Sequence, residues 1–361
     1  MIKTFFKRLF FGLLVLLILA GAFAAHEWKA EKPFLFRVFL DRTLISMAFE
    51  SPETLTSLGF LESVGITGHN AKLDNDSPEK GDELFEKLPQ IKATLLSYAD
   101  EDLSESERLS KEITLYLLDV GEEAEQYRYH NYPVNQLFGV QNGYPSFMEA
   151  QHQVNTVEDG DNYLARLEGV RVKFAQNLAG IQLRTEKGIV PPRFVIDRVL
   201  TEMNEFVATD PKDNILYTSL RDKLEKASDI PVNEQNRLLA STEANIKDYV
   251  YPAYDLFIEY FERIKTTAST DDGFWRLPQG NEAYKASLRF FTTTDHTADE
   301  IHNIGLSEVD RIQSEILTIL TAQGFDTTQG FTTAIDALAA DESFYYEDSD
   351  EGRAQILADY Q

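Results

Sequence analysis

The sequence predicts a mainly α-helical protein with a membrane or signal segment at its N-terminus. Three observations predict this class. Three capping-box patterns each precede an apolar series at helical spacing. Runs with the period-two alternation of strands do not occur. The third observation is an uninterrupted apolar stretch that begins near residue 9.

The N-terminal segment combines a basic flank with this apolar stretch. Lys3, Lys7 and Arg8 precede Leu9–Ala25, which contains only apolar residues and glycine. Because cations mark the cytoplasmic side, we expect the rest of the chain to be exported to the periplasm. Two interpretations remain. A small-x-small pattern at 22–24 suits signal peptidase, whereas an uncleaved helix would tether the protein to the inner membrane. The length of the stretch favours the anchor.

Three segments follow from this pattern. We expect residues 1–25 to be the signal peptide or transmembrane anchor, residues 26–83 an adapter, and residues 84–361 a helical body. Turn-forming residues at 75–78 mark a break near the end of the adapter. The first helix of the body begins at the capping box of Ser104 and Glu107. The residues expected on its inward face are Leu109, Ile113, Tyr116, Leu117 and Val120.

The next two helices carry clear start and stop signals. A capping box of Thr156 and Asp159 opens the first of them, and Gly188 suits its end as a left-handed residue. Pro191-Pro192 opens the second, since proline is tolerated in a first turn. The residues expected to face inward are Tyr163, Leu167, Val170, Phe174, Leu178 and Ile181 in the first helix, and Phe194, Val195, Val199, Met203 and Phe206 in the second.

A longer helix is predicted from Val232 to Thr267. Pro252 should kink it, because proline removes one backbone hydrogen bond and crowds the preceding turn. The third capping box, Thr297 with Glu300, precedes an apolar series that ends at Ile319. The final residues, 352–361, are typical of the opening of another helix.

Composition excludes several kinds of function. The 361 residues include 34 Lys and Arg against 60 Asp and Glu, a formal net charge of −26, so we expect no nucleic-acid partner. The sequence contains no cysteine, which excludes disulfides, thiolate metal ligands and a lipoprotein attachment site. The motifs G-x-S-x-G, G-x-x-x-x-G-K-[ST] and G-x-G-x-x-G are also absent, so a nucleophile elbow and a phosphate-binding loop have no support.

Zinc peptidases commonly bind their ion through His-Glu-x-x-His, in which two imidazoles lie one helical turn apart. His26 and Glu27 begin such a pattern, but the second histidine is missing. We therefore expect no catalytic residue and no metal ligand in this chain. Asp295, Asp299 and His302 are expected to form a solvated helix start rather than a metal site.

Residues 131–147 mix aromatic, amide and proline residues with almost no charge. Such loops can line a pocket, although a rigid connector packed on the body is the alternative. Gln141, Tyr144 and His152 are our candidates for lining a substrate channel, with a structural His152–carboxylate pair as the alternative for the histidine. Trp275 is expected in the core.

Several segments resemble the bacterial domain-of-unknown-function 885 family. They lie in order along the chain: residues 141–147 with His152, 163–167, 188–194, 277–284, 292–295, 302–309, 344–346 and 352–355. This resemblance implies a helical, exported relative of gluzincin zinc peptidases. It also implies that zinc is held by a His-Glu-x-x-Pro-Gly-His-His segment, which this sequence does not contain. The expectation is therefore an N-terminal fragment that continues beyond residue 361 in full-length relatives.

Two functions are consistent with these features. In the first, the full-length protein hydrolyses peptides with zinc, while this chain supplies part of the substrate channel, has no cofactor of its own and is inactive. In the second, the chain is a non-catalytic peptide-binding or scaffolding protein of the cell envelope. Peptides and the membrane are the expected partners in both cases.

Overall fold

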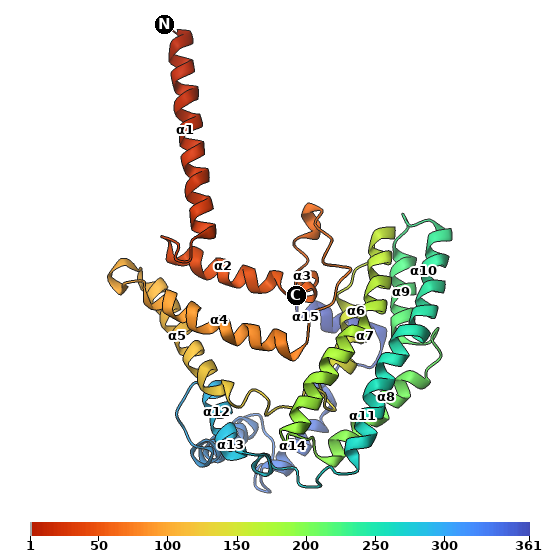
Figure 1. The fold of residues 1–361 in the computed structure, drawn as a ribbon. Helices are drawn as coiled ribbons and strands as arrows, with labels where there is room; N and C mark the ends of the chain where they lie inside the picture. The colour runs from red at the N-terminus through yellow and green to blue at the C-terminus, as the bar shows by residue number, and fades with distance from the viewer. Residues whose placement is uncertain (1) are drawn as a thin grey trace. The chain divides into compact units, whose positions relative to one another are not determined.

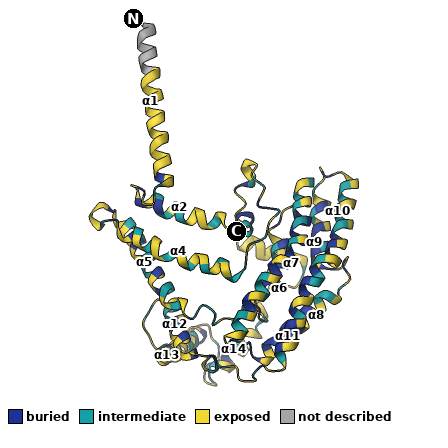
Figure 2. Ribbon diagram, viewed as in Figure 1, coloured by how far each residue is buried: buried dark blue, intermediate teal, exposed yellow. Residues whose placement is uncertain are grey.

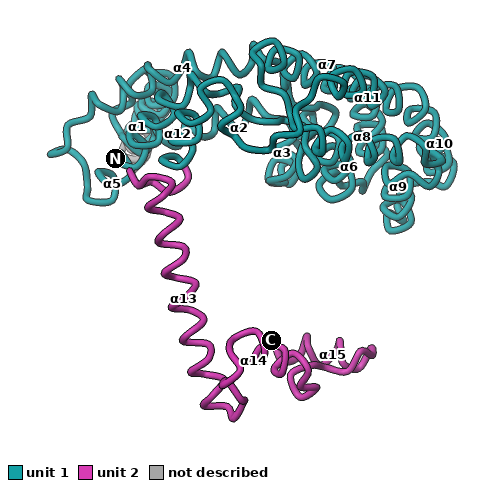
Figure 3. Tube along the Cα trace, turned by 90° about the horizontal axis from the view of Figure 1, so that it is seen from below, with its two compact units in different colours: residues 1–290 teal, residues 291–361 magenta. Residues whose placement is uncertain are grey.

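The computed structural model describes the backbone of residues 2–361 and the side chains from residue 10 onward. Helices account for all regular structure in this part of the chain, which confirms the predicted mainly α-helical class. The chain divides into two compact units, residues 1–290 and residues 291–361 (Figure 3). Each unit is described by itself.

Helix α1 (Ile2–Lys29) contains the predicted apolar segment. Its stretch Phe10–Lys29 is the one described helix that is long and apolar enough to cross a membrane, and it could be a signal or an anchor. The end of α1 is fixed to the body by polar contacts. Arg42 donates to the carbonyls of Trp28 and Ala30, at 2.9 and 2.5 Å, and so satisfies groups that a helix end leaves open.

Helices α2 (Phe36–Phe49), α3 (Pro52–Leu58), α4 (Pro78–Leu96) and α5 (Glu105–Glu125) follow (Figure 1). α4 and α5 pack as a helical hairpin. The predicted capping box of Ser104 and Glu107 is present at the start of α5. A small cluster holds this region together, formed by Phe36, Phe39, Leu95, Tyr98, Leu103 and Leu118.

The main bundle comprises α6 (Val140–Ala150), α7 (Val157–Glu186), α8 (Arg193–Ala208), α9 (Ile215–Lys226), α10 (Val232–Asn245) and α11 (Tyr251–Lys265). α7 lies against α10 and α11, and α11 also packs on α8. Figure 2 shows the buried residues along the facing sides of these helices. Five of the six residues predicted to face inward from α7 are buried, and Leu178 packs against them.

The long helix predicted from Val232 to Thr267 is interrupted just before Pro252. A π-helical turn, Ile246–Val250, joins α10 to α11, and Pro252 occupies the first turn of α11. A π-turn widens the helix by one residue, so the missing N–H of proline falls where the hydrogen-bond ladder already changes register. Ile246, Val250 and Phe257 remain fully buried across this junction.

Helix α12 (Gly280–Thr292) follows α11. The unit of residues 291–361 contains α13 (Ala298–Ala322), α14 (Phe331–Ala339) and α15 (Asp350–Asp359). The predicted capping box of Thr297 and Glu300 opens α13. Short helical turns lie at Glu62–Val64, Asp100–Asp102, Phe274–Arg276 and Glu342–Phe344.

Several local predictions were wrong. Residues 140–147, expected in a loop, belong to α6, which contains Pro145. Trp275, expected in the core, is 72% exposed. Leu109, Ile113 and Leu117 are exposed on α5. The small cluster instead contains Leu118 and, partly buried, Leu115 from α5. Val120 is buried as predicted, so the expected face was wrong for three of its five residues and not for the whole helix.

Phe194 is likewise exposed, although it was expected to face inward from α8. Its neighbour Val195 is buried, as are Val199 and Met203. These three residues recur at intervals of four, which places them on one face of the helix, and Phe194 lies beside that face in the first turn.

Candidate functional site

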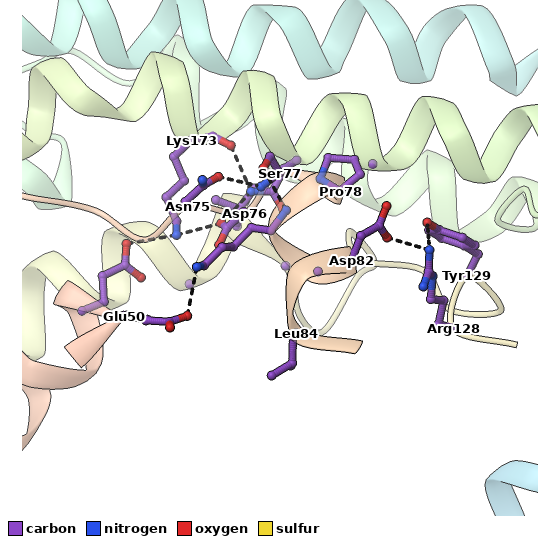
Figure 4. Close-up of a pocket in the computed structure, with 18 of the residues that line it drawn as sticks. Glu50, Asn75, Asp76, Ser77, Pro78, Asp82, Leu84, Arg128, Tyr129 and Lys173 are labelled. Carbon is purple, nitrogen blue, oxygen red and sulfur yellow. Dashed lines mark hydrogen bonds and ion pairs between the residues drawn. The ribbon is translucent and has the colours of Figure 1, made fainter. Parts of the chain in front are cut away.

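A cleft of about 800 Å³ lies within residues 47–184. Its walls come from the end of α2, the start of α3, the start of α4, the start of α6 and one side of α7 (Figure 4). The charged residues that line it are Glu50, Glu53, Asp76, Lys80, Asp82, Arg128, Lys173 and Arg184. This volume lies within the range of small-ligand sites.

Local sequence signals build the edges of the cleft. Ser77 caps α4 by accepting a hydrogen bond from the N–H of Lys80, and Pro78 occupies the first turn. Gly139 precedes α6 with φ near +143°, which favours glycine. A Cβ at this position would lie only 2.8 Å from the carbonyl oxygen of Pro133, so the close approach of two backbone segments also requires glycine.

One end of the cleft is organised around Lys173. This buried amine lies 3.0 Å from the carboxylate of Glu53 and 2.7 Å from that of Asp76. Asn177 also donates to Asp76, at 2.8 Å. Burial by itself lowers the pKa of Lys173, but the two carboxylates outweigh burial and raise it. Lys173 therefore stays charged and fixes α3 and the segment before α4 onto α7.

The opposite end contains Arg128 and Tyr129 (Figure 4). Arg128 pairs with Asp82 at 2.6 Å and donates to the hydroxyl of Tyr129 at 3.0 Å. Burial opposes the charge of Arg128, yet contacts with Tyr129 and Asp82 raise its pKa. Arg184, from the last turn of α7, lies over the ring of Tyr129. This end is therefore rich in cations.

The structure separates the three residues predicted to line a substrate channel. Tyr144 lines this cleft, but only 2% of it is exposed and its hydroxyl donates to the carbonyl of Arg166 at 3.2 Å. Burial raises the pKa of Tyr144 well above its usual value. Gln141 lies instead in a second cleft, of about 410 Å³, between α6 and α8, and its amide donates to the carbonyl of Asn135.

His152 lies in the packed interior, with 1% of its surface exposed. Its Nδ1 is 2.7 Å from Nη1 of Arg166, which identifies the imidazole as the acceptor of this hydrogen bond. Burial, followed by the charge of Arg166, lowers the pKa of His152 to about 3. A neutral histidine thus satisfies a buried guanidinium, and the carboxylate partner considered from the sequence is not its contact.

Arg166 links distant parts of the chain. Its Nε donates to the carbonyl of Lys72 at 2.9 Å, and its Nη2 donates to the hydroxyl of Thr56 at 2.7 Å. Burial lowers the pKa of Arg166 to about 10. Because these bonds join α7 to α3 and to the segment before α4, they hold one wall of the cleft in place.

A metal centre has no support among the side chains of residues 10–361. No three His, Asp or Glu side chains in the described part of the chain lie close enough to hold a metal ion. His152 contacts a cation, and His69 pairs with the single carboxylate of Glu62 at 2.8 Å. These contacts do not fit the tetrahedral ligand set of zinc.

Sequence reasoning missed the charged residues of the cleft. Glu53, Asp82, Arg128, Lys173 and Arg184 belong to separate elements, and none stands in a motif of fixed spacing. The signal that was available is Lys173 on α7. It lies between Val170 and Phe174 on the buried side of the helix and therefore needed a partner.

The chain is similar to known proteins in its sequence and in its fold. A family model described as "Bacterial protein of unknown function (DUF885)" matches residues 52–361. A crystal structure described as "the putative lipoprotein from Colwellia psychrerythraea" is similar to the chain, with 22% identity and a TM-score of 0.76. The alignment covers 87% of this chain and 55% of that one, so it shows a shared fold over about half of the solved chain. No curated protein matches the sequence.

Proposed function

This chain belongs to the bacterial family of unknown function DUF885, and we propose that it forms the peptide-binding wall of an exported, metallopeptidase-like protein. The observation that supports this proposal is the arrangement of charge in the cleft. Carboxylates and an amide surround Lys173 at one end, and cations surround Tyr129 at the other. A short peptide in extended form has an amine at one end and a carboxylate at the other, and a cleft of this size suits it.

The walls between these ends suit a peptide as well. Leu84, Phe85 and Val140 supply apolar surface, while Asn75 and Asn177 supply side-chain amides. Amides can hydrogen-bond to the backbone of an extended peptide, and apolar surface buries its side chains. Because Lys80 and Lys173 are already paired with carboxylates, the walls are polar without carrying a large excess of one charge.

Catalysis is proposed for the whole protein rather than for residues 1–361. The side chains described in residues 10–361 do not fit a zinc site, so in this proposal the ion is bound elsewhere in the full-length protein. The solved relative supports this division, since this chain spans only 55% of that chain. The kinship with gluzincin peptidases remains part of this proposal. The alternative is a non-catalytic peptide-binding or scaffolding protein of the cell envelope, which would use the same cleft.

Export is the remaining part of the proposal. Helix α1 would tether the protein to the inner membrane and place the body in the periplasm. The structurally similar protein from Colwellia psychrerythraea is described as a "putative lipoprotein", whereas this chain has no cysteine for lipid attachment. An uncleaved α1 would therefore supply membrane attachment in its place.

Photo-crosslinking tests the peptide-binding proposal. The full chain, in detergent micelles, is mixed with a random tetrapeptide pool that carries benzoylphenylalanine at its second position. After irradiation, mass spectrometry locates the crosslinks. We expect them at lining residues such as Leu84, Phe85 and Val140, with few on the exposed face of α13. Crosslinks scattered over the surface, or none, would contradict peptide binding in the cleft.

A hydrolysis assay with the same pool tests whether catalysis requires residues outside this chain. We expect the pure chain to leave the tetrapeptides intact, with or without added zinc. Chelator-sensitive hydrolysis by this chain would show that its own residues form a metal site, and it would overturn the proposal.

A further inference from the structure

Three cations surround a single aromatic ring at one end of the cleft. The charged groups of Arg128, Arg184 and Lys187 lie 4.9, 5.4 and 5.1 Å from the centre of the Tyr129 ring. A ring face attracts a cation, but each such contact is weak at an exposed site. The attraction of one ring does not offset the mutual repulsion of three cations. A bound anion would therefore stabilise the cluster.

The carboxylates of the chain neutralise only one of the three. Arg128 pairs with Asp82 at 2.6 Å and with Glu125 at 3.3 Å. Within the described residues, no carboxylate comes within 4.0 Å of the charged nitrogens of Arg184 or Lys187. This surplus of positive charge stands out in a chain whose formal net charge is −26.

Arg184 is held in a fixed position. Its Nε donates to the side-chain oxygen of Asn131 at 2.9 Å, and its Nη1 donates to the carbonyl of Gly180 at 2.9 Å. Burial lowers the pKa of Arg184, with Tyr129 as the one group opposing this effect. A half-buried guanidinium that is oriented by neutral acceptors and lacks a counter-ion is a common arrangement for binding a carboxylate.

The helix dipole explains part of this arrangement. Arg184 lies in the last turn of α7 and Lys187 directly follows that turn, where cations are stabilised by the carbonyl ends of the helix. The dipole does not explain why Arg128, which follows α5, converges on the same ring. Nor does it explain why Arg184 and Tyr129 both line the cleft.

We propose that Arg184, Lys187 and Tyr129 bind the C-terminal carboxylate of a peptide that lies in the cleft. The proposal rests on the peptide-binding function above and adds the direction of the peptide. Its C-terminus lies beside Tyr129, and its N-terminus points towards the carboxylates around Lys173. A peptide carboxylate fits the planar guanidinium of Arg184 through paired hydrogen bonds, and Lys187 adds a second positive charge.

The test compares three tetrapeptide pools on the full chain in detergent micelles. Each pool carries benzoylphenylalanine at its second position. The first ends in a free carboxylate, the second in an amide, and the third in an amide with glutamate at the third position. The measured quantity is the peptide concentration that gives half-maximal crosslinking. We expect the free-acid pool to bind at least ten-fold more tightly than the amidated pool.

The pools separate the two sources of a carboxylate. If the amidated pool with glutamate matches the free acid, the site binds an acidic side chain and the proposed direction is wrong. If all three pools bind equally, carboxylate recognition is wrong while peptide binding in the cleft stands. If no pool is crosslinked, peptide binding itself is contradicted.

Single substitutions show which residues bind the C-terminal carboxylate. Arg184→Gln and Lys187→Gln should each weaken the free-acid pool several-fold and leave the amidated pool unchanged. Lys187 is exposed, so its variant tests the charge without disturbing packing. Arg171→Gln is the matched control, because Arg171 is an exposed cation of α7 that neither lines the cleft nor lies over the Tyr129 ring. Equal free-acid binding by wild type, Arg184→Gln and Lys187→Gln would overturn the assignment.

Discussion

Helices α7 and α13 begin with the same local signal and differ in what covers them. Each opens with a capping box, Thr156 with Asp159 in α7 and Thr297 with Glu300 in α13. Each continues with an apolar series at helical spacing. In α7 that series is buried against α10 and α11. Within residues 291–361, α13 packs on α14, and most of its apolar side chains are exposed.

This difference shows what an amphipathic pattern does and does not specify. Capping and periodicity act within a helix and fix where it begins and which residues share a face. Burial requires a second element with a complementary face. The α7 series has several such elements in the bundle, whereas the α13 series is an apolar surface of the kind that binds a partner.

Matched leucine substitutions should give the largest contrast. Leu167 in α7 is fully buried, and Leu306 in α13 is 54% exposed. Leu167→Ala should lower the free energy of local unfolding by about 2–5 kcal/mol, because it removes buried methyl groups and leaves a cavity. Leu306→Ala should change it by less than about 0.5 kcal/mol. Native-state hydrogen exchange on each helix measures both effects, and equal losses would contradict the contrast.

Acid should destabilise the bundle through His152, which packs against Arg166 of α7. The pKa of this imidazole is about 3 in the folded chain and about 6.5 when unfolded. Between these values the unfolded chain binds the extra proton. Stability is therefore complete above pH 6.5 and falls as the pH is lowered, by up to about 1.4 kcal/mol per unit.

Urea denaturation at pH 6.5 and pH 5 measures this effect, with an expected loss of about 2 kcal/mol from this group. The range lies above the pH at which most carboxylates titrate, so His152 dominates the change. His152→Gln keeps an acceptor for Arg166 and should lose most of the pH dependence. The same pH dependence in wild type and variant would show that His152 is already charged in the folded chain.

The capping boxes should give a smaller contrast than the leucine pair, because their effects should be similar in both helices. Thr156→Ala and Thr297→Ala each remove a hydroxyl that accepts a backbone N–H at 3.1 and 3.2 Å. Each should cost about 1 kcal/mol, since capping acts locally and does not depend on burial of the apolar face. Hydrogen exchange in the first turn of each helix reports the change. A large loss of stability in α7 with none in α13 would show that the contribution of a capping box depends on tertiary packing, which would contradict the prediction.

Much of the fold followed from local signals. The three capping boxes and the buried face of α7 were predicted from the sequence and are present. A kink was expected at Pro252, and the structure has a π-helical turn just before that residue. The residues wrongly expected to face inward were Leu109, Ile113 and Leu117 of α5 and Phe194 in the first turn of α8. Several turns of α5 are apolar on more than one side, so periodicity alone does not choose the side that packs.

The cleft was harder to predict because its residues come from separate helices and connections. In the structure Tyr144 lines the cleft, whereas Gln141 lies in a different cleft and His152 lies in the interior. Arg166 was the overlooked signal for His152. It lies between Tyr163 and Val170 on the apolar face of α7, and a cation at such a position requires buried acceptors.

Hydrogen exchange with and without the free-acid tetrapeptide pool tests peptide binding in the cleft most directly. Binding should slow exchange in the first turns of α4 and α6, in residues 128–131 and in the last turns of α7. Exchange in α13 should be unchanged, because its apolar face does not belong to the site. Protection confined to α13, with none around Tyr129 and Arg184, would contradict the proposed site.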